Sequence, residues 1–454
     1  MDNYSSNANK RDLWSSRVGF ILGTTGAAVG LGNIWRFPYI TGENGGGAFV
    51  LVYLVCVCLI GVPLMMAEFV IGRRGASSPS VSFRNLAEEA KQSQHWQFVG
   101  TLGVIVSFLI LTFYSVIGGW TLAFLVKSIG SGFDGISGDD GQRQFREFMS
   151  SPLEIIFWHT LFMVISGAVV VRGIAHGIER LATYLMPCML LILVILFGYS
   201  MTTPGFGQSM SFMFNFNYSK LSTYGVVVAL GHAFFSLGLA QSVMVAFGSH
   251  LPRRIALTQA AFIVSILDTV VALAVGVIIF SIVFSNGLEI SSGPGLVFES
   301  LPVAFGRMPF GGFIGVAFFV MLVLAAWSSS VGLLVPPVDR LQVRHGVSRA
   351  RSTYIVGVAA WLIGILCALS FNWLADFRPV GGMTIYRFLD YLTSSILMPV
   401  TGLLVAIFAG WIVSERASAE ELQLGKHVLF GIWRFLVRFV VPIIIVIIIA
   451  TSVI

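Results

Sequence analysis

Apolar runs of about twenty residues recur along the whole 454-residue chain, and no other feature limits its fold as strongly. A helix of that length spans the hydrocarbon core of a bilayer. Charged residues make up only 11% of the chain, whereas average soluble domains carry about 25%. The sequence therefore predicts an all-α polytopic membrane protein and excludes a soluble protein with a large apolar core.

Polar connections separate eleven predicted spans. They cover residues 17–39, 46–71, 98–128, 153–171, 177–200, 222–249, 259–284, 309–338, 353–371, 386–412 and 427–450. When the connections are assigned alternately to the two sides, 19 of the 27 lysines and arginines fall on the side of the N-terminus and 8 on the other. The positive-inside rule then predicts a cytoplasmic N-terminus and, with eleven spans, an extracellular C-terminus.

Several kinds of site are disfavoured by the sequence. The four cysteines, Cys56, Cys58, Cys188 and Cys367, lie in apolar runs and form neither a disulfide framework nor a metal-ligand pattern. The polar N-terminal segment lacks the pattern of a signal peptide. A serine hydrolase built on His232 and Ser236 would lack a third, orienting group. For that reason we expect the protein not to be an enzyme.

Two of the spans contain residues that break helices. The first contains "AAVGLGN" at 27–33, and the sixth contains "FFSLGLAQS" at 234–242. Paired interruptions in matching positions of two halves indicate a transporter binding site, because freed carbonyls can bind cations and freed N–H groups can bind anions. The alternative is that the glycines only allow close helix packing, and the pairing of the two segments argues against it.

An aspartate stands near the middle of the seventh span, in "VSILDTVVALAVG". A carboxylate at this depth is costly, so Asp268 is by default a functional residue. No basic residue lies near the centre of the same span to neutralise it. Asp268 is therefore predicted to bind a cation.

The chain also resembles a known family over nearly its whole length. The shared segments are "AAVGLGNIWRFPY" (27–39), "ENGGGAFVLVY" (43–53), "GVPLMMAEFVIGR" (61–73), "FYSVIGGW" (113–120), "FFSLGLAQS" (234–242), "GPGLVFESLPVAFGRMP" (293–309) and "AAWSSS" (325–330). On these segments it is identified as a member of the neurotransmitter:sodium symporters, and it is similar to their bacterial branch of leucine and tryptophan transporters.

The resemblance implies a fold of two inverted five-helix repeats, helices 1–5 and 6–10, with helices 1 and 6 unwound at mid-membrane. It divides the chain into a cytoplasmic segment (1–16), a first repeat (17–200), an extracellular connection (201–221), a second repeat (222–412) and a cytoplasmic loop with helix 11 (413–454). Many relatives have a twelfth helix, which we do not expect in this chain. The bacterial inner membrane is the expected location.

The resemblance also implies two sodium sites. The first consists of the backbone carbonyl of Ala28 with Asn33, Ser236 and Asp268. The second consists of the carbonyls of Gly26, Val29 and Ala325 with Ser328 and Ser329. Many animal relatives carry asparagine at position 268 and need chloride, so Asp268 predicts that this protein does not. The serines of "WSSS" could instead bond only to the preceding turn of their own helix.

The substrate implied by the resemblance is a hydrophobic L-amino acid, aliphatic or aromatic. Gly30 replaces the aspartate that binds the amine in monoamine relatives. The substrate carboxylate is expected at the first sodium, the N–H groups of Leu31 and Gly32, and the Tyr114 hydroxyl, and the ammonium at carbonyls around Ala28, Phe234 and Ser236. Phe235 is the expected lid. The expected side-chain pocket is lined by Ile110, Ile117, Phe235, Gly238, Gln241, Ser329 and Leu333, where Gln241 could add a polar contact and Gly238 enlarges the space.

Charge placement predicts two gates. Arg36 and Asp390 resemble the outer gate of the family, and Arg11 and Trp14 resemble the inner gate. The usual acidic partner of the inner gate aligns with Val343, so Asp339, one turn earlier, is the candidate substitute.

Two further expectations concern single positions in the second and fifth helices. Glu68 is expected to accept N–H groups from unwound helix 1. Gly177 and Pro187 mark either a static kink in helix 5 or a turn that unwinds.

The expected partners are the amino-acid substrate and membrane lipid, with no nucleic acid and no obligate protein partner. A sensor that binds without transporting remains the alternative function.

Overall fold

The computed structural model describes residues 12–130, 133, 138–217, 221–288, 295–425 and 428–453. Within these ranges every regular element is a helix, apart from an isolated β-bridge between Val380 and Met383. This confirms the all-α prediction.

Among the described residues, nine helices are long and apolar enough to cross a membrane. They are Gly47–Gly75 (α3, Gly47–Cys56; η2, Val57–Gly61; α4, Val62–Gly75), Gln94–Gly130 (η3, Gln94–Trp96; α6, Gln97–Gly130), Pro152–Val170 (α8), Ile174–Ser200 (η4, Ile174–Glu179; α9, Arg180–Ser200), Leu257–Ser285 (α13), Gly311–His345 (α15), Arg349–Leu369 (α16), Ile385–Ile412 (α17, Ile385–Tyr391; η7, Leu392–Leu397; α18, Met398–Ile407; η8, Phe408–Ile412) and Val428–Ile447 (α20, Val428–Phe435; η9, Leu436–Val440; and the start of α21, Val441–Val453).

The first predicted span is a broken helix. α1 (Arg17–Ala28) begins after Ser16, whose side chain accepts a hydrogen bond from the N–H of Gly19 and so caps the helix. The helix stops at Ala28 and resumes as a π-helical segment, η1 (Gly32–Arg36), followed by α2 (Phe37–Glu43), with a bend of 50°. Counted as one span, this pair raises the number to ten.

The predicted span 222–249 is also interrupted. α11 (Thr223–Ser236) and α12 (Val243–Ser249) are separated by residues 237–242, where Gly238, Ala240 and Ser242 all have positive φ. Neither helix is long enough to cross a membrane alone. The expected break is present, but the count of eleven spans is not confirmed by helix length in the described part of the chain.

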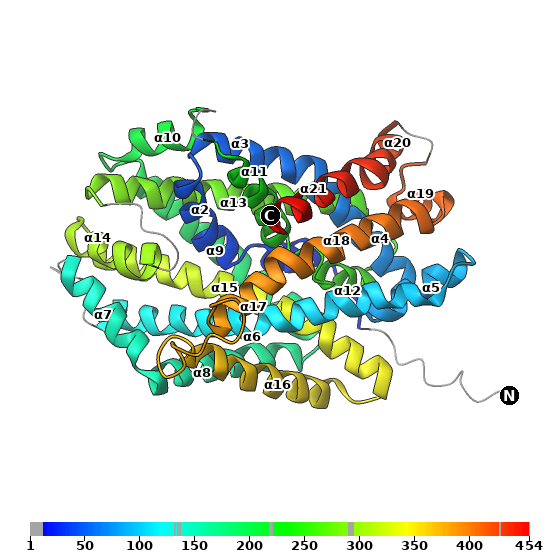
Figure 1. Ribbon diagram of the computed structural model, residues 1–454, viewed down its shortest axis with the longest axis horizontal. Helices are drawn as coiled ribbons and strands as arrows, with labels where there is room; N and C mark the ends of the chain where they lie inside the picture. The colour runs from blue at the N-terminus through cyan, green and yellow to red at the C-terminus, as the bar shows by residue number, and fades with distance from the viewer. Residues whose placement is uncertain are drawn as a thin grey trace.

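Short helices lie at the two ends of the bundle. These are α5 (Pro79–Glu89), α7 (Gly138–Ser150), α10 (Phe206–Phe214), η6 (Leu296–Ser300) with α14 (Leu301–Arg307), and α19 (Glu415–Leu422). In Figure 1, α7, α10 and α14 gather at the left, whereas α5 and α19 lie at the right. Connections that the sequence assigns to the same side therefore lie at the same end. We call these the α7 end and the α5 end.

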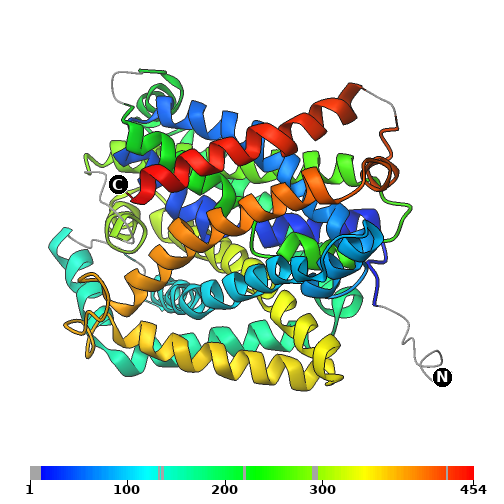
Figure 2. The same cartoon turned by 45° about the vertical axis from the view of Figure 1, so that its right-hand side comes forward.

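The interior of the bundle is formed by long helices packed closely together. α6 runs beside α15, and the Ser107 hydroxyl on α6 donates to the carbonyl of Leu333 on α15 at 2.8 Å. Glycine allows α6 to approach α8, because a Cβ on Gly119 would lie 2.7 Å from the backbone nitrogen of His159. Figure 2 shows α20 and α21 on the outside of this bundle, alongside α18.

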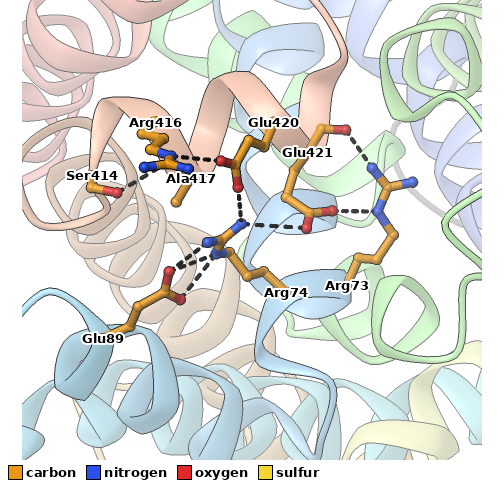
Figure 3. A network of polar contacts seen from close by, with 8 residues as sticks. All are labelled: Arg73, Arg74, Glu89, Ser414, Arg416, Ala417, Glu420 and Glu421. Carbon is orange, nitrogen blue, oxygen red and sulfur yellow. Dashed lines mark hydrogen bonds and ion pairs between the residues drawn. The ribbon is translucent and has the colours of Figure 1, made fainter.

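A network of charged side chains joins three helices at the α5 end (Figure 3). Arg73, at the end of α4, donates to Glu421 of α19 at 2.5 Å, and both side chains are buried. Arg74 pairs with Glu89 of α5 at 2.5 Å and with Glu420 of α19 at 3.1 Å. The hydrogen bond from Arg74 holds the pKa of Glu89 below its usual value. The network neutralises both arginines and fixes α4, α5 and α19 together.

Candidate substrate and sodium sites

The break in the first span is positioned by contacts with α6 and α15. The N–H of Leu31 donates to the Tyr114 hydroxyl of α6 at 3.1 Å. A Cβ on Gly30 would lie 2.4 Å from Oγ of Ser329 on α15 and 2.6 Å from the Tyr114 hydroxyl. A side chain at position 30 would have to displace these two hydroxyls, so the backbone of the break lies directly against both helices.

Three of the predicted first-site residues form one buried cluster. Asn33, Ser236 and Asp268 have no exposed surface. The Asn33 amide nitrogen lies 2.8 Å from Oδ1 of Asp268 and 3.0 Å from Oγ of Ser236, and the Ser236 hydroxyl donates to Oδ2 of Asp268 at 2.5 Å. These partners of Asp268 are neutral, so the cluster lacks the positive charge that a buried carboxylate needs.

Tyr53 is a member of this cluster that the sequence did not single out. Its hydroxyl lies 3.4 Å from Oγ of Ser236, and its side chain is fully buried. Tyr53 belongs to the shared segment "ENGGGAFVLVY", but nothing in its spacing indicates that it faces Ser236. Ala28, the fourth predicted member of the first site, ends α1 and is buried.

The predicted second-site residues lie on the other side of the same break. The Ser329 hydroxyl reaches from α15 to the carbonyls of Gly26 and Val29, at 3.2 Å each. The Ser328 hydroxyl instead donates to the carbonyl of Ala325 in its own helix, at 3.0 Å. A bond to the preceding turn therefore describes Ser328 but not Ser329. A Cβ on Gly26 would lie 3.2 Å from Cβ of Ser328, so these residues are neighbours.

A small pocket of about 50 Å³ opens between the break and α6. Of the predicted substrate residues, its lining contains Leu31, Gly32, Tyr114, Ile117 and Phe235. Its other lining residues are Trp35, Arg36, Tyr39, Phe113, Tyr386 and Asp390. Phe113 and Tyr386 were not predicted, although Phe113 directly precedes Tyr114 and Tyr386 lies one helical turn before Asp390. The pocket is therefore more aromatic than predicted.

The remaining predicted substrate residues do not line this pocket. They are Ala28, Ile110, Phe234, Ser236, Gly238, Gln241, Ser329 and Leu333. Gln241 is buried, and its amide nitrogen lies 4.0 Å from the sulfur of Met398 on α18. Gly238 has a φ of +63°, and a Cβ there would lie 3.3 Å from the methyl group of Met244. The positive φ of the turn between α11 and α12 therefore favours glycine at this position, and so does the nearby methyl group of Met244.

The predicted outer gate is assembled beside the pocket. Nη1 of Arg36 lies 3.6 Å from Oδ1 of Asp390, and the Ser394 hydroxyl contacts both groups, at 3.3 Å and 3.1 Å. The guanidinium carbon of Arg36 also lies 4.8 Å from the centre of the Phe235 ring. The gate pair and the expected lid thus contact each other directly.

The inner gate is described only in part, because Arg11 lies outside the described residues. Trp14 is buried, and its indole N–H donates to the carbonyl of Phe247 at 3.1 Å. Asp339 pairs with Arg349 at 3.1 Å and with His250 at 3.2 Å, and His250 donates to the carbonyl of Asp12 at 2.7 Å. Asp339 therefore reaches the N-terminal segment through His250.

Val343, which aligns with the usual acidic gate residue, is half exposed. It lines a separate cavity between α5, α6 and α15, and no described residue of the N-terminal segment lines that cavity. Among the described residues, Asp339, one turn earlier in α15, reaches the N-terminal segment only through His250. Glu179 instead accepts hydrogen bonds directly from Ser15 and Ser16.

The expectation for Glu68 is corrected by the structure. Its carboxylate accepts a hydrogen bond from the N–H of Ala240 at 2.7 Å, so it supports the break between α11 and α12 rather than the one in the first span. The fifth span is helical through Pro187, with Gly177 in the π-helical segment η4. The span is one continuous helix, and no unwound turn occurs within Ile174–Ser200.

The chain is similar to known transporters along nearly its whole length. Residues 11–134 and 147–454 match the profile of the sodium:neurotransmitter symporter family. The uncharacterized sodium-dependent transporter YhdH of Bacillus subtilis is 34% identical over 438 residues, covering 96% of both chains. An uncharacterized sodium-dependent transporter of Haemophilus influenzae is 32% identical over 450 residues, covering 98% of both.

A solved structure is also similar. The crystal structure of MhsT in complex with L-phenylalanine matches with a TM-score of 0.92 and 39% identity, covering 97% of this chain and 100% of that one. The similarity therefore extends over nearly all of the helices described above. Together with the matched family profile, it shows that this chain is a multi-pass membrane transporter that belongs to the sodium:neurotransmitter symporter family.

Proposed function

We propose that the protein is a sodium-coupled symporter that takes up hydrophobic L-amino acids, both aliphatic and aromatic, by alternating access and without chloride. The observation that carries this proposal is the buried carboxylate of Asp268, whose hydrogen-bond partners Asn33 and Ser236 are neutral. A buried carboxylate without a positive partner is unfavourable. A bound sodium ion supplies the missing charge.

The first proposed sodium site consists of Ala28, Asn33, Ser236 and Asp268. Sodium is a hard cation that prefers oxygen ligands. The Asn33 amide nitrogen faces Asp268 at 2.8 Å and its oxygen accepts from the N–H of Gly30, so the amide oxygen would have to be released to serve as a sodium ligand. The second proposed site consists of Gly26, Val29, Ala325, Ser328 and Ser329, where Ser329 already lies 3.2 Å from two of the carbonyls.

The proposed substrate lies in the pocket beside the first site. Its carboxylate contacts the first sodium, the N–H groups of Leu31 and Gly32, and the Tyr114 hydroxyl, and its side chain extends between the aromatic residues of the pocket. Gly30 supplies no carboxylate for a bare amine, and an aspartate there would have to displace the Ser329 hydroxyl, 2.4 Å from an added Cβ, which disfavours monoamine substrates. The L-phenylalanine in the MhsT structure supports an aromatic substrate.

The proposed topology keeps eleven spans in two inverted repeats, 17–200 and 222–412, with α11 and α12 together forming the sixth span. The N-terminus is cytoplasmic and the C-terminus extracellular. The separation of α5 and α19 from α7, α10 and α14 at opposite ends supports this alternation.

Uptake into proteoliposomes tests the function. Radiolabelled leucine, phenylalanine and tryptophan are offered under inward gradients of sodium or potassium, with chloride or gluconate as the anion. We expect accumulation with sodium and either anion, and none with potassium alone. Sodium-dependent binding without accumulation would instead identify a sensor, and a strict chloride requirement would contradict the role given to Asp268.

A further inference from the structure

We infer that the α5 end of the protein carries a specific site for an anionic phospholipid, with the head group in a basic pocket and one acyl chain in an adjoining apolar groove. The pocket, of about 720 Å³, lies between α5, η3, α6 and α15. The groove, of about 260 Å³, lies between α6, α15 and α16. Arg340 and Arg344 line both cavities and connect them.

The charged residues of the head-group pocket are all basic. Arg84, Arg340, Arg344 and His95 line it, and none of its eleven described lining residues is acidic. Arg340 donates to the hydroxyls of Ser80 and Thr101, which are neutral. Its charge is therefore not cancelled by these neighbours.

The other basic residues of the pocket are at most weakly paired. Nε of Arg84 is buried without a hydrogen-bond partner and pairs with Glu88 of the same helix at 3.8 Å, and exposed pairs of this kind contribute little. Arg344 and His95 are exposed. Val343 lines the pocket and adds no negative charge. Guanidinium groups arranged in this way bind phosphate oxygens well.

The arginines of the neighbouring network behave differently, which shows that the charge of the pocket is a local feature. Arg73 and Arg74 lie at the same end of the molecule, and both are paired with glutamates (Figure 3). The α5 end therefore has enough acidic residues to neutralise one group of arginines. Among the described residues, Arg340 and Arg344 form no ion pair, and Arg84 forms one weak, exposed pair with Glu88. The pocket therefore keeps a net positive charge that an anion from outside the chain can neutralise.

The groove identifies that anion as a lipid. Val104, Ile105 and Phe108 of α6 line it together with Leu341 of α15 and Ile355 of α16. With a rise of 1.5 Å per residue, residues 104–108 lie roughly 10–16 Å along α6 from Gln97, inside the predicted span. Ile105 and Ile355 are about half exposed, which suits contact with an acyl chain. A free phosphate ion would leave this groove empty.

Lipid retention measured by native mass spectrometry tests the inference without depending on transport activity. The purified protein is equilibrated with phosphatidylglycerol or phosphatidylcholine. We expect the double variant Arg84→Gln with Arg344→Gln to bind phosphatidylglycerol roughly tenfold to thirtyfold more weakly, as removal of two basic groups implies. The matched control, Arg253→Gln with Arg351→Gln, removes two exposed arginines that line neither cavity, and it should bind like the unchanged protein.

Two further measurements separate a lipid site from other outcomes. Ala359→Trp fills the groove and should reduce phosphatidylglycerol binding, and millimolar inorganic phosphate should not displace the lipid. Equal losses in both double variants, equal retention of phosphatidylcholine, or full displacement by phosphate would each overturn the inference. Unchanged melting temperatures of the variants confirm that binding, and not folding, was altered.

Discussion

The two proposed sodium sites lie a few residues apart along the same helix break, yet they differ in charge. The first contains Asp268 in a fully buried cluster, whereas the second contains only hydroxyls and backbone carbonyls around Ser329. Removing an ion from the first site leaves a buried carboxylate without a counter-charge, which is costly. Removing an ion from the second leaves neutral groups that already bond to each other. The comparison implies that the second site empties more readily.

Asp268→Asn is expected to have the largest effect, because it removes the only charge in either site while keeping the shape of the side chain. We expect sodium-driven uptake to need at least roughly a hundredfold more sodium, and up to a few thousandfold, since loss of one partner of a buried charge pair costs about 3–5 kcal/mol. The sodium concentration for half-maximal uptake measures the effect. Asp376→Asn, in an exposed loop, is the matched control.

Chloride sharpens the interpretation of that variant. If chloride restores uptake by Asp268→Asn, the first site needs a negative charge rather than this particular carboxylate. If the variant keeps the sodium dependence of the unchanged protein, the first site, which contains Asp268, does not bind sodium.

The two breaks could be predicted from the sequence because glycines beside polar residues, in matching positions of two apolar spans, weaken both helices locally. The sequence could not join Asn33 to Asp268, because those residues are 235 positions apart, and only the resemblance to known transporters placed them together. Tyr53, whose hydroxyl also faces Ser236, was therefore missed. A helical face does not reveal which distant side chain it meets.

Other features depend on packing that the sequence pattern does not encode. The connections between the predicted spans contain α5, α7 and α10, short helices that a search for long apolar runs does not predict. The acceptor Glu68 was assigned to the wrong break, because only the turn at Ala240 directs an N–H toward its carboxylate. Gly238 was assigned to the pocket on the absence of a side chain, although its positive φ already requires glycine-like freedom.

Gly30→Ala is expected to weaken both sites, since this residue lies between them. Its N–H donates to the Asn33 amide oxygen at 3.2 Å, and an added Cβ would lie 2.4 Å from Oγ of Ser329. Overpacking of this kind costs about 1–3 kcal/mol, so sodium affinity should fall roughly fivefold to a hundredfold. Binding of labelled substrate as a function of sodium measures it. Gly357→Ala, with nothing within 4 Å of the added Cβ, should change little, and equal behaviour of the two variants would refute the crowding argument.

Ser329→Ala should have a smaller effect than Ser236→Ala. Ser329 bonds to neutral carbonyls, and one such bond contributes about 1 kcal/mol, which corresponds to roughly fivefold in sodium affinity. Ser236 donates to the carboxylate of Asp268 at 2.5 Å, and a bond to a charged group contributes more. Both variants are measured by sodium titration of uptake. A loss at Ser329 as large as that at Ser236 would remove the distinction between a charged and a neutral site.

Asp390→Asn is expected to have the smallest effect, although it makes the same chemical change as Asp268→Asn. Asp390 is 36% exposed and lies 3.6 Å from Arg36, which is 24% exposed. Water and salt screen such a pair, and exposed pairs contribute about 0–1 kcal/mol. We expect the substrate concentration for half-maximal uptake to change by no more than about fivefold, with the difference shrinking as choline chloride is added. The sodium dependence should stay unchanged, because the gate acid binds no ion. A sodium affinity that fell as far as in Asp268→Asn would mean that burial does not separate the two aspartates, and the electrostatic argument for the first site would fail with it.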